Sequence, residues 1–173
     1  MTTPVLIIAL LVLRGLGALG VRRFATWAAS GAHALALMLV MTASAHFVPA
    51  GVTVMPTHAD LVAMVPPFVP DPGLMVYATG VLELLGAIGL VLTRTRRAAG
   101  FGLAVLFLLL LPANVYAAVA DVPFHGEAAS PLWQRIPEQV LYIGVALAAA
   151  LSAPSRESTA GTRQAEPVTA GRP

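Results

Sequence analysis

Few ionisable or amide side chains interrupt the long apolar runs of this sequence, and these few are the candidates for chemistry. Glu83 lies well inside the apolar run 74–93, roughly 13 Å below its start at about 1.5 Å per residue. A carboxyl at that depth is costly in hydrocarbon, so it is a functional candidate by default. Two interpretations stand. Glu83 either makes a structural ion pair or hydrogen bond with Arg14, His33 or Asn114, or it stays protonated in a dry pocket, where it binds a polar ligand head or relays a proton.

Further polar side chains lie on other apolar runs, in the same half of the membrane. His46 comes near the end of the second run and contributes to the mouth of a site. Asn114 follows Pro112, whose ring removes one backbone hydrogen bond and should kink the helix, so the amide either satisfies freed backbone or binds a ligand. Tyr77 either lines the same site or anchors the helix at the membrane interface. Together, one polar-lined cavity is predicted from His46, Tyr77, Glu83, Asn114 and Gln139.

Two other intramembrane side chains are assigned structural roles. Arg14 lies about 15 Å from the start of the first run, where it costs about 2.5 to 3.5 kcal/mol, and it is placed to meet Glu83. His33 is interpreted as a satisfied core or interfacial histidine. No metal site is predicted, and the absence of Cys excludes disulfides, thiolate ligands and iron–sulfur clusters within this chain.

The composition excludes an ordinary water-soluble domain. Of the 173 residues, 58% are hydrophobic and only 10% are charged, whereas soluble domains carry about 25% charged residues. The net charge of +2 is spread along the chain, without a clustered basic face. A nucleic-acid partner is therefore excluded, and the lipid bilayer is the predicted environment.

The apolar runs have the length that a bilayer demands. A hydrocarbon core about 30 Å thick needs roughly 20 apolar residues per helix, and the first and last runs are near the lower limit. We predict an all-α membrane protein, with a four-helix transmembrane bundle preceded by one N-terminal transmembrane helix, five in total. The runs are 4–20, 24–47, 74–93, 98–120 and 136–151.

The arginines predict the orientation. The loops after the first and third runs, together with the tail, contain eight Arg, while the opposite loops contain only Arg135. Cytoplasmic loops carry such an excess, so the N-terminus is predicted outside and the C-terminus in the cytoplasm. The domains are then 1–23, the N-terminal helix and basic loop; 24–151, the four-helix membrane domain; and 152–173, a tail too poor in apolar residues to fold.

Two loops lie on the predicted outer side. Six prolines in residues 48–73 exclude a continuous helix. One short helix fits between Pro56 and Pro66, with Thr57 and Asp60 as a weak capping box, and an irregular loop is an equal alternative. Residues 121–135 are predicted to be a connector.

Several motifs together resemble a known family. The segments HF at His46, MVPPFVP from Met64, TGVLELLGAIGL from Thr79 and PANVY from Pro112 occur in an order that resembles the DoxX-like family of small bacterial integral membrane proteins. The likeness covers about residues 24–151. It implies a four-helix core in the bacterial plasma membrane, and an association with quinone-linked oxidation and membrane oxidoreductase complexes. The absence of Cys departs from any thiol-based sulfur chemistry.

The resemblance implies an accessory subunit of a membrane redox system rather than an enzyme on its own. A quinone or another small lipophilic ligand would occupy the outer-half cavity, where Glu83 and His46 exchange protons or hydrogen-bond the headgroup, and Asn114 and Gln139 orient it. One alternative is a non-catalytic scaffold or assembly factor, whose Gly-rich third run packs against a partner. Another is a carrier of a small hydrophobic compound. Expected partners are a membrane oxidoreductase, another membrane protein or a second copy of the chain.

Overall fold

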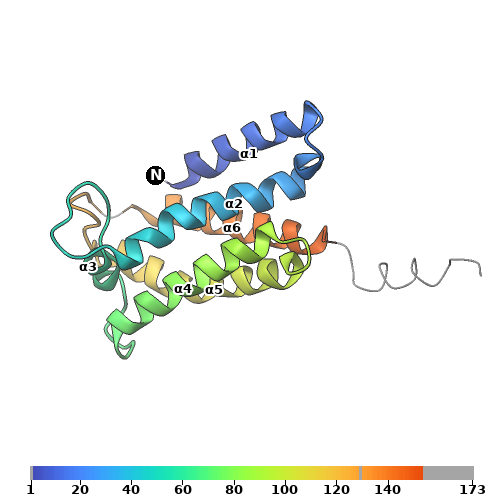
Figure 1. The fold of residues 1–173 in the computed structure, drawn as a ribbon. Helices are drawn as coiled ribbons and strands as arrows, with labels where there is room; N and C mark the ends of the chain where they lie inside the picture. The colour runs from blue at the N-terminus through green and yellow to red at the C-terminus, as the bar shows by residue number, and fades with distance from the viewer. Residues whose placement is uncertain (1, 129, 154–173) are drawn as a thin grey trace, which may run out of the picture.

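The structure, a computed structural model, describes residues 2–128 and 130–153, and there the predicted all-helical class is confirmed. Six α-helices and no strand are found in these two ranges. Short 3₁₀ turns at Arg22–Phe24 and Ala45–Phe47 flank the second helix. The five long helices lie alongside one another (Figure 1). The helices are α1 (Thr2–Ala18), α2 (Trp27–Ser44), α3 (His58–Ala63), α4 (Pro72–Val91), α5 (Arg96–Val119) and α6 (Leu132–Leu151).

Three helices are long and apolar enough to cross a membrane: Trp27–Phe47, α4 and α5. Helix α1 is apolar but shorter, with 17 residues. The outer faces carry exposed large apolar side chains, such as Leu85 on α4 and Leu109 on α5, which are 59% and 71% exposed. Soluble monomers rarely expose apolar surface on this scale, so these helices indicate a membrane protein.

Helix α6 begins at Leu132, four residues before the predicted apolar run. The prediction 121–135 for the connecting loop was therefore too long at its end. Pro137 lies inside this helix. The helix accommodates it because proline has a helical φ and removes only one backbone donor. With 20 residues, α6 is about 30 Å long, the thickness of a hydrocarbon core.

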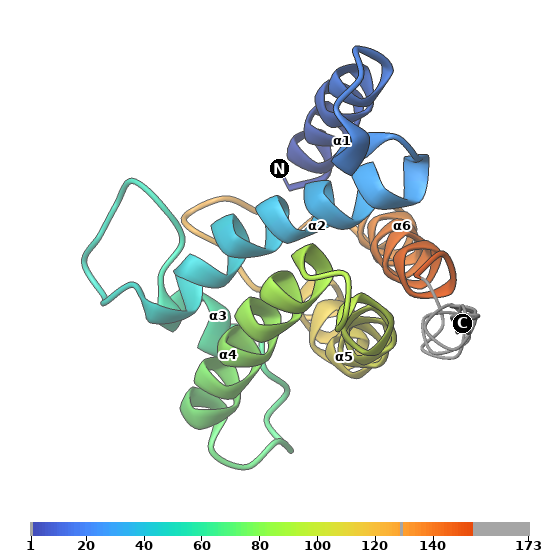
Figure 2. The same cartoon turned by 45° about the vertical axis from the view of Figure 1, so that its right-hand side comes forward.

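The helix order in the bundle explains which side chains meet. In the turned view, α2 lies between α1 and α4, and α5 packs beside α4 and α6 (Figure 2). Leu35, Leu90 and Leu103 are almost completely buried between these helices. A side chain on Gly86 would collide with Leu103, and a Cβ on Gly89 would lie 2.6 Å from that of Ala99. The glycines of α4 therefore serve packing within the chain.

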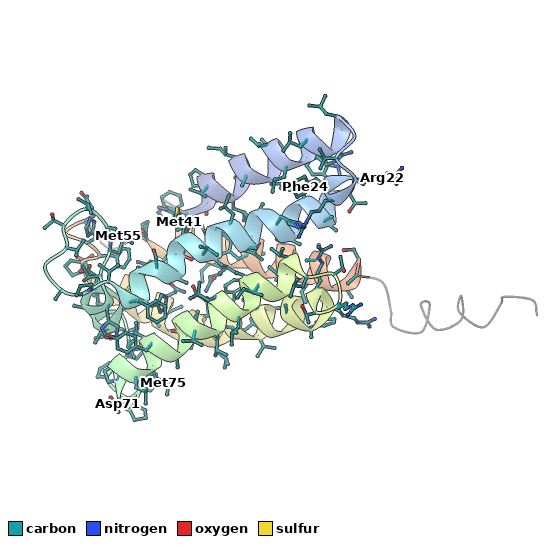
Figure 3. All side chains as sticks on the ribbon, in the orientation of Figure 1. Arg22, Phe24, Met41, Met55, Asp71 and Met75 are labelled. Atoms are coloured by element: carbon teal, nitrogen blue, oxygen red, sulfur yellow. The ribbon has the colours of Figure 1, made fainter. Side chains whose placement is uncertain are left out.

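Charged and polar loops divide between the two ends of the bundle. We call the end that contains Arg22–Phe24, the α4–α5 loop and the start of α5 the basic end, and the opposite end, with the long loops, the α3 end. Figure 3 shows Arg22 at the basic end, and Met55 and Asp71 at the α3 end. At the basic end, buried Arg96 donates from Nε to the carbonyl of Leu90 at 2.7 Å, which satisfies one of the last carbonyls of α4.

The short helix α3 confirms the prediction of a helix between Pro56 and Pro66. Thr57 accepts a hydrogen bond from the backbone N–H of Asp60, and the Asp60 carboxylate accepts from the Thr57 backbone N–H at 2.8 Å, which completes a capping box. This backbone hydrogen bond lowers the pKa of Asp60 below its ordinary value. The cap therefore favours the ionised carboxylate.

Candidate functional site

Glu83 lies on the one face of α4 that is buried. The buried positions Val76, Gly80, Glu83, Ala87 and Leu90 recur at intervals of three and four residues, which places them on one side of the helix. Glu83 is only 6% exposed. It is about 16 Å from the first residue of α4, near the middle of the helix. The face of α4 that contains Gly80 and Glu83 therefore points into the bundle.

His46 reaches Glu83 from the 3₁₀ turn that extends α2. Its Nδ1 lies 2.7 Å from the carbonyl oxygen of Val76. A carbonyl oxygen can only accept a hydrogen bond, so Nδ1 carries a proton, and in the neutral imidazole Nε2 has the free lone pair. The Thr79 hydroxyl donates to the same carbonyl at 3.0 Å, so the polar groups around Val76 fix the orientation of the ring.

The His46 Nε2 atom faces the Glu83 carboxyl across 3.8 Å. This separation is longer than a hydrogen bond. Because Nδ1 is already protonated, a single proton between the facing atoms would belong either to Glu83 or to Nε2. The Glu83 carboxyl has no hydrogen-bond donor within the two described ranges, yet 9% of the side-chain surface remains accessible. The pair can therefore hold or release one proton, and the carboxyl has unused hydrogen-bonding capacity.

Gly80 allows the close approach of α4 to His46. A Cβ built on Gly80 would lie 2.6 Å from Cβ and 2.7 Å from Cγ of His46. Real Cβ atoms do not tolerate such contacts, so any side chain here would push the imidazole or the helix away. The distance between His46 and Glu83 therefore depends on this glycine.

Aromatic rings continue from the pair toward the α3 end. The ring of Tyr77 stacks on His58 with centroids 4.0 Å apart, and its other neighbour is Phe47 at 6.0 Å. His58 Nε2 donates to the carbonyl of Gly73 at 3.1 Å, which holds the first residues of α3 against α4. Tyr77 is 45% exposed, so this aromatic group forms the surface next to the buried pair.

Asn114 and Gln139 lie in a second polar group, between α5 and α6. The Asn114 Oδ1 atom accepts from Arg135 Nη1 at 3.0 Å, while its Nδ2 donates to the carbonyl of Leu110 at 3.3 Å. Gln139 Nε2 donates to the carbonyl of Phe107 at 3.3 Å. No hydrogen bond between described residues joins this group to the His46–Glu83 pair. The five side chains predicted to line one cavity thus occupy two polar groups.

None of the three partners considered for Glu83 contacts it: His33 and Asn114 are hydrogen-bonded elsewhere, and the buried Nε of Arg14 has no hydrogen-bond partner among the described residues. The Arg14 guanidinium lies over the ring of Trp27, 5.5 Å from its centroid. His33 Nδ1 donates to the carbonyl of Ala29 at 2.7 Å, and its Nε2 accepts from Arg23 at 2.8 Å. Asn114 is bound to Arg135, as described above. Arg14 does not reach Glu83 because α2 lies between α1 and α4 (Figure 2).

Three functional contacts were missed by sequence reasoning. Arg96 follows the end of a helix, where basic residues commonly bind the last carbonyls, so its position contained a usable signal. Arg135 was counted only as a loop charge, because the early start of α6 was not recognised. The stacking of His58 on Tyr77 depends on how the proline-rich loop folds back, and no local pattern indicates it.

A cavity of about 490 Å³ opens at the α3 end. Its lining includes Val52, Thr57, Asp60 and His125, and none of the five predicted cavity residues. Within the described ranges, no group of three or more His, Cys, Asp or Glu side chains has the geometry to hold a metal ion.

Comparisons with known proteins give a family but no activity. Residues 35–150 match the family described as Domain of unknown function (DUF8561), and this range includes His46, Glu83, Asn114 and Gln139. No curated protein and no solved structure matches the chain. Because the match covers well over half of the sequence, the chain belongs to the DUF8561 family.

Proposed function

We propose that this protein spans the bacterial plasma membrane with five helices, with its N-terminus outside and its C-terminus in the cytoplasm. Helices α1 and α6 would cross beside the three longer or more apolar helices, since all five lie alongside one another (Figure 1). The α1–α2 loop, the α4–α5 loop and the start of α5 all lie at the basic end. Together these three segments contain five arginines. An excess of Arg marks the cytoplasmic side, which supports this orientation.

Within this topology, we propose that the protein is a DoxX-like accessory subunit of a membrane redox system. Its role would be to bind a quinone or a similar small lipophilic molecule in the outer half of the bundle. The observation that carries the proposal is the buried His46–Glu83 pair, with 3.8 Å between the facing atoms. Both residues belong to the segments that resemble the family, HF and TGVLELLGAIGL.

The chemistry of the pair suits a ligand that gains and loses protons. A quinone takes up protons when it is reduced, and its oxygens accept hydrogen bonds. Protonated Glu83 would hydrogen-bond a quinone oxygen and supply one of the two protons taken up on reduction, while the second would come from water. On oxidation of the quinol, one released proton would return to the pair, at Glu83 or at His46 Nε2. The Val76 carbonyl keeps the ring oriented, because it accepts the Nδ1 proton at 2.7 Å. Electrons would come from a partner membrane oxidoreductase.

Asn114 and Gln139 would act at a distance from this ligand. Their hydrogen bonds join α5 to α6 and to Arg135, so they support the bundle in the proposal instead of orienting a headgroup. Tyr77 and the rings beside it would form the entrance, because they lie between the buried pair and the membrane surface.

The scaffold alternative has less support from the packing. It depended on the glycines of α4 as a surface for a partner protein. Gly80, Gly86 and Gly89 instead contact His46, Leu103 and Ala99 of the same chain. A carrier function has no specific observation in its favour. The redox-linked binding subunit is therefore the proposal that we develop.

The test compares two histidines of the same helical segment. We would isolate the protein directly from membranes in lipid nanodiscs, extract bound small molecules and quantify quinones by mass spectrometry. His46→Gln should lower the amount of quinone per protein at least tenfold, because it removes the proton acceptor of the pair. His33→Gln, near the opposite end of α2, is the matched control and should leave it unchanged.

Glu83→Gln adds the decisive comparison. It preserves the size of the side chain and a hydrogen-bond donor, but it cannot release a proton. A folded Glu83→Gln protein without quinone supports the proposal. A wild-type protein that is isolated without any quinone, or equal quinone in the His46 and His33 variants, would contradict it.

A further inference from the structure

The basic end contains two arginines that converge on one backbone oxygen. Arg23 Nη2 and Arg96 Nη2 each donate to the carbonyl of Val91 at 3.4 Å. Arg96 also donates from Nε to Leu90, and Arg23 from Nε to His33. These contacts hold two guanidinium groups next to each other at the end of α4, one from the 3₁₀ turn before α2 and one from the first residue of α5.

This pair of like charges lacks an acidic partner in the described part of the chain. The only ion pair among residues 2–128 and 130–153 is His46–Glu83, at a different site. The Nη1 groups of Arg23 and Arg96 have no acceptor there, and neither is sealed from the surface. Arg22, Arg94 and Arg97 are exposed around the same end, so the local charge is strongly positive. An anion is the missing partner.

The location selects the kind of anion. The neighbouring side chain of Trp27 is 60% exposed and lies under the Arg14 guanidinium. Tryptophan favours the headgroup level of a membrane, and arginines near a helix end extend toward it. Arg14 lies four residues before the last residue of α1, which is about 6 Å along the helix axis, so its side chain is close enough to this end to extend toward the headgroups. Basic pockets between transmembrane helices on the cytoplasmic side bind lipid headgroups.

We propose that Arg23 and Arg96 bind the phosphate group of an anionic phospholipid of the cytoplasmic leaflet. The carbonyls of Leu90 and Val91 hold the two guanidinium groups in position before the lipid arrives, so little side-chain freedom is lost on binding. Their Nη1 groups donate the hydrogen bonds to the phosphate. This inference uses the membrane placement proposed above, but it does not depend on the identity of the outer-half ligand.

The experiment measures phospholipid binding by the full chain in detergent. Titration with phosphatidylglycerol, followed by native mass spectrometry, should yield a saturable first site that phosphatidylcholine does not fill. Arg23→Gln should weaken this site about tenfold, as expected for the loss of a charge-assisted hydrogen bond. Arg22→Gln is the matched control. It removes the same charge from the same turn, but the Arg22 side chain makes no hydrogen bond with the described residues, so a change below threefold is expected.

The outcomes separate a built site from general attraction. Equal effects of Arg23→Gln and Arg22→Gln would overturn the proposal, because the charge alone would then explain the binding. Complete displacement of the lipid by millimolar inorganic phosphate would assign the site to free phosphate instead. If Arg23→Gln fails to fold, Arg23→Lys replaces it, since lysine retains the charge but not the fork of donors. The quinone content, measured in the same samples, reports separately on the outer-half proposal.

Discussion

Replacing Gly80 with alanine tests whether the approach of α4 to His46 holds the pair together. The added Cβ would lie 2.6 Å from His46 Cβ and 2.7 Å from Cγ, so either the imidazole or the helix must move. Overpacking of this kind typically costs about 1 to 3 kcal/mol. Alanine also favours the helix over glycine by about 0.5 to 1 kcal/mol, which partly offsets the cost.

Gly144→Ala separates these two effects. Gly144 lies inside α6, and a Cβ at that position would meet no atom within 4 Å. This variant therefore gains the helical preference without the collision. The difference in unfolding free energy between the two variants isolates the packing contribution, about 1 to 3 kcal/mol. The shift of His46 or α4 that the Gly80→Ala collision causes should also lower the quinone content of this variant, while Gly144→Ala should retain the wild-type content.

The assay is reversible unfolding in mixed micelles with increasing dodecyl sulfate, followed by far-ultraviolet circular dichroism. Wild type, Gly80→Ala and Gly144→Ala are measured in one detergent at one lipid ratio. If Gly80→Ala is as stable as Gly144→Ala, then His46 does not lie against α4 as described, and the geometry of the pair is refuted.

Two further outcomes follow from the caps at the two ends of the bundle. Arg96→Gln should lower the unfolding free energy by about 1.5 to 3 kcal/mol, since it removes the charged donor of the Leu90 carbonyl and one of the two arginine donors of the Val91 carbonyl. The same change at exposed Arg97 should have an effect within about 0.5 kcal/mol. The hydrogen bond from the Thr57 backbone holds the pKa of the Asp60 carboxyl below its ordinary value, so the cap of α3 should be intact at neutral pH and lost as the pH falls through the lower folded-state pKa. Thr57→Ala should raise the pKa of Asp60, measured by NMR titration, because the side-chain hydroxyl no longer donates, and an unchanged value would contradict this account.

The sequence predicts the helical segments well, because their length is dictated by hydrocarbon thickness. The apolar runs 74–93 and 98–120 differ from α4 and α5 by at most two residues at either end. The start of α6 was missed, since Arg135 and Pro137 resemble loop residues when only hydropathy is considered. Both fit in a helix here, where Arg135 finds Asn114 and the ring of Pro137 removes a single donor.

The sequence identified single residues of the candidate site, but not which of them contact one another. Depth alone identified Glu83 as costly in the membrane. Its neighbour could not be identified in this way, because the order of helices in a bundle leaves no trace in hydropathy. Arg14 and Glu83 have opposite charges and compatible depths, yet α2 separates their helices (Figure 2). The meeting of His46 and Glu83 needs the 3₁₀ turn and Gly80, which are features of tertiary packing.

The geometry of the pair also decides which substitution is informative. The Val76 carbonyl fixes the Nδ1 proton, so Nε2 of neutral His46 offers only a lone pair to Glu83. A glutamine at position 83 would keep a donor group opposite that lone pair, its amide N–H in place of the hydroxyl of a protonated glutamate, across a separation of 3.8 Å. The structural role of Glu83 is therefore retained in Glu83→Gln, while the release of a proton is abolished. Leucine would remove both roles together. A ligand that needs only a hydrogen-bond donor stays bound to the glutamine variant, whereas one held by the proton-exchanging carboxyl is lost from it.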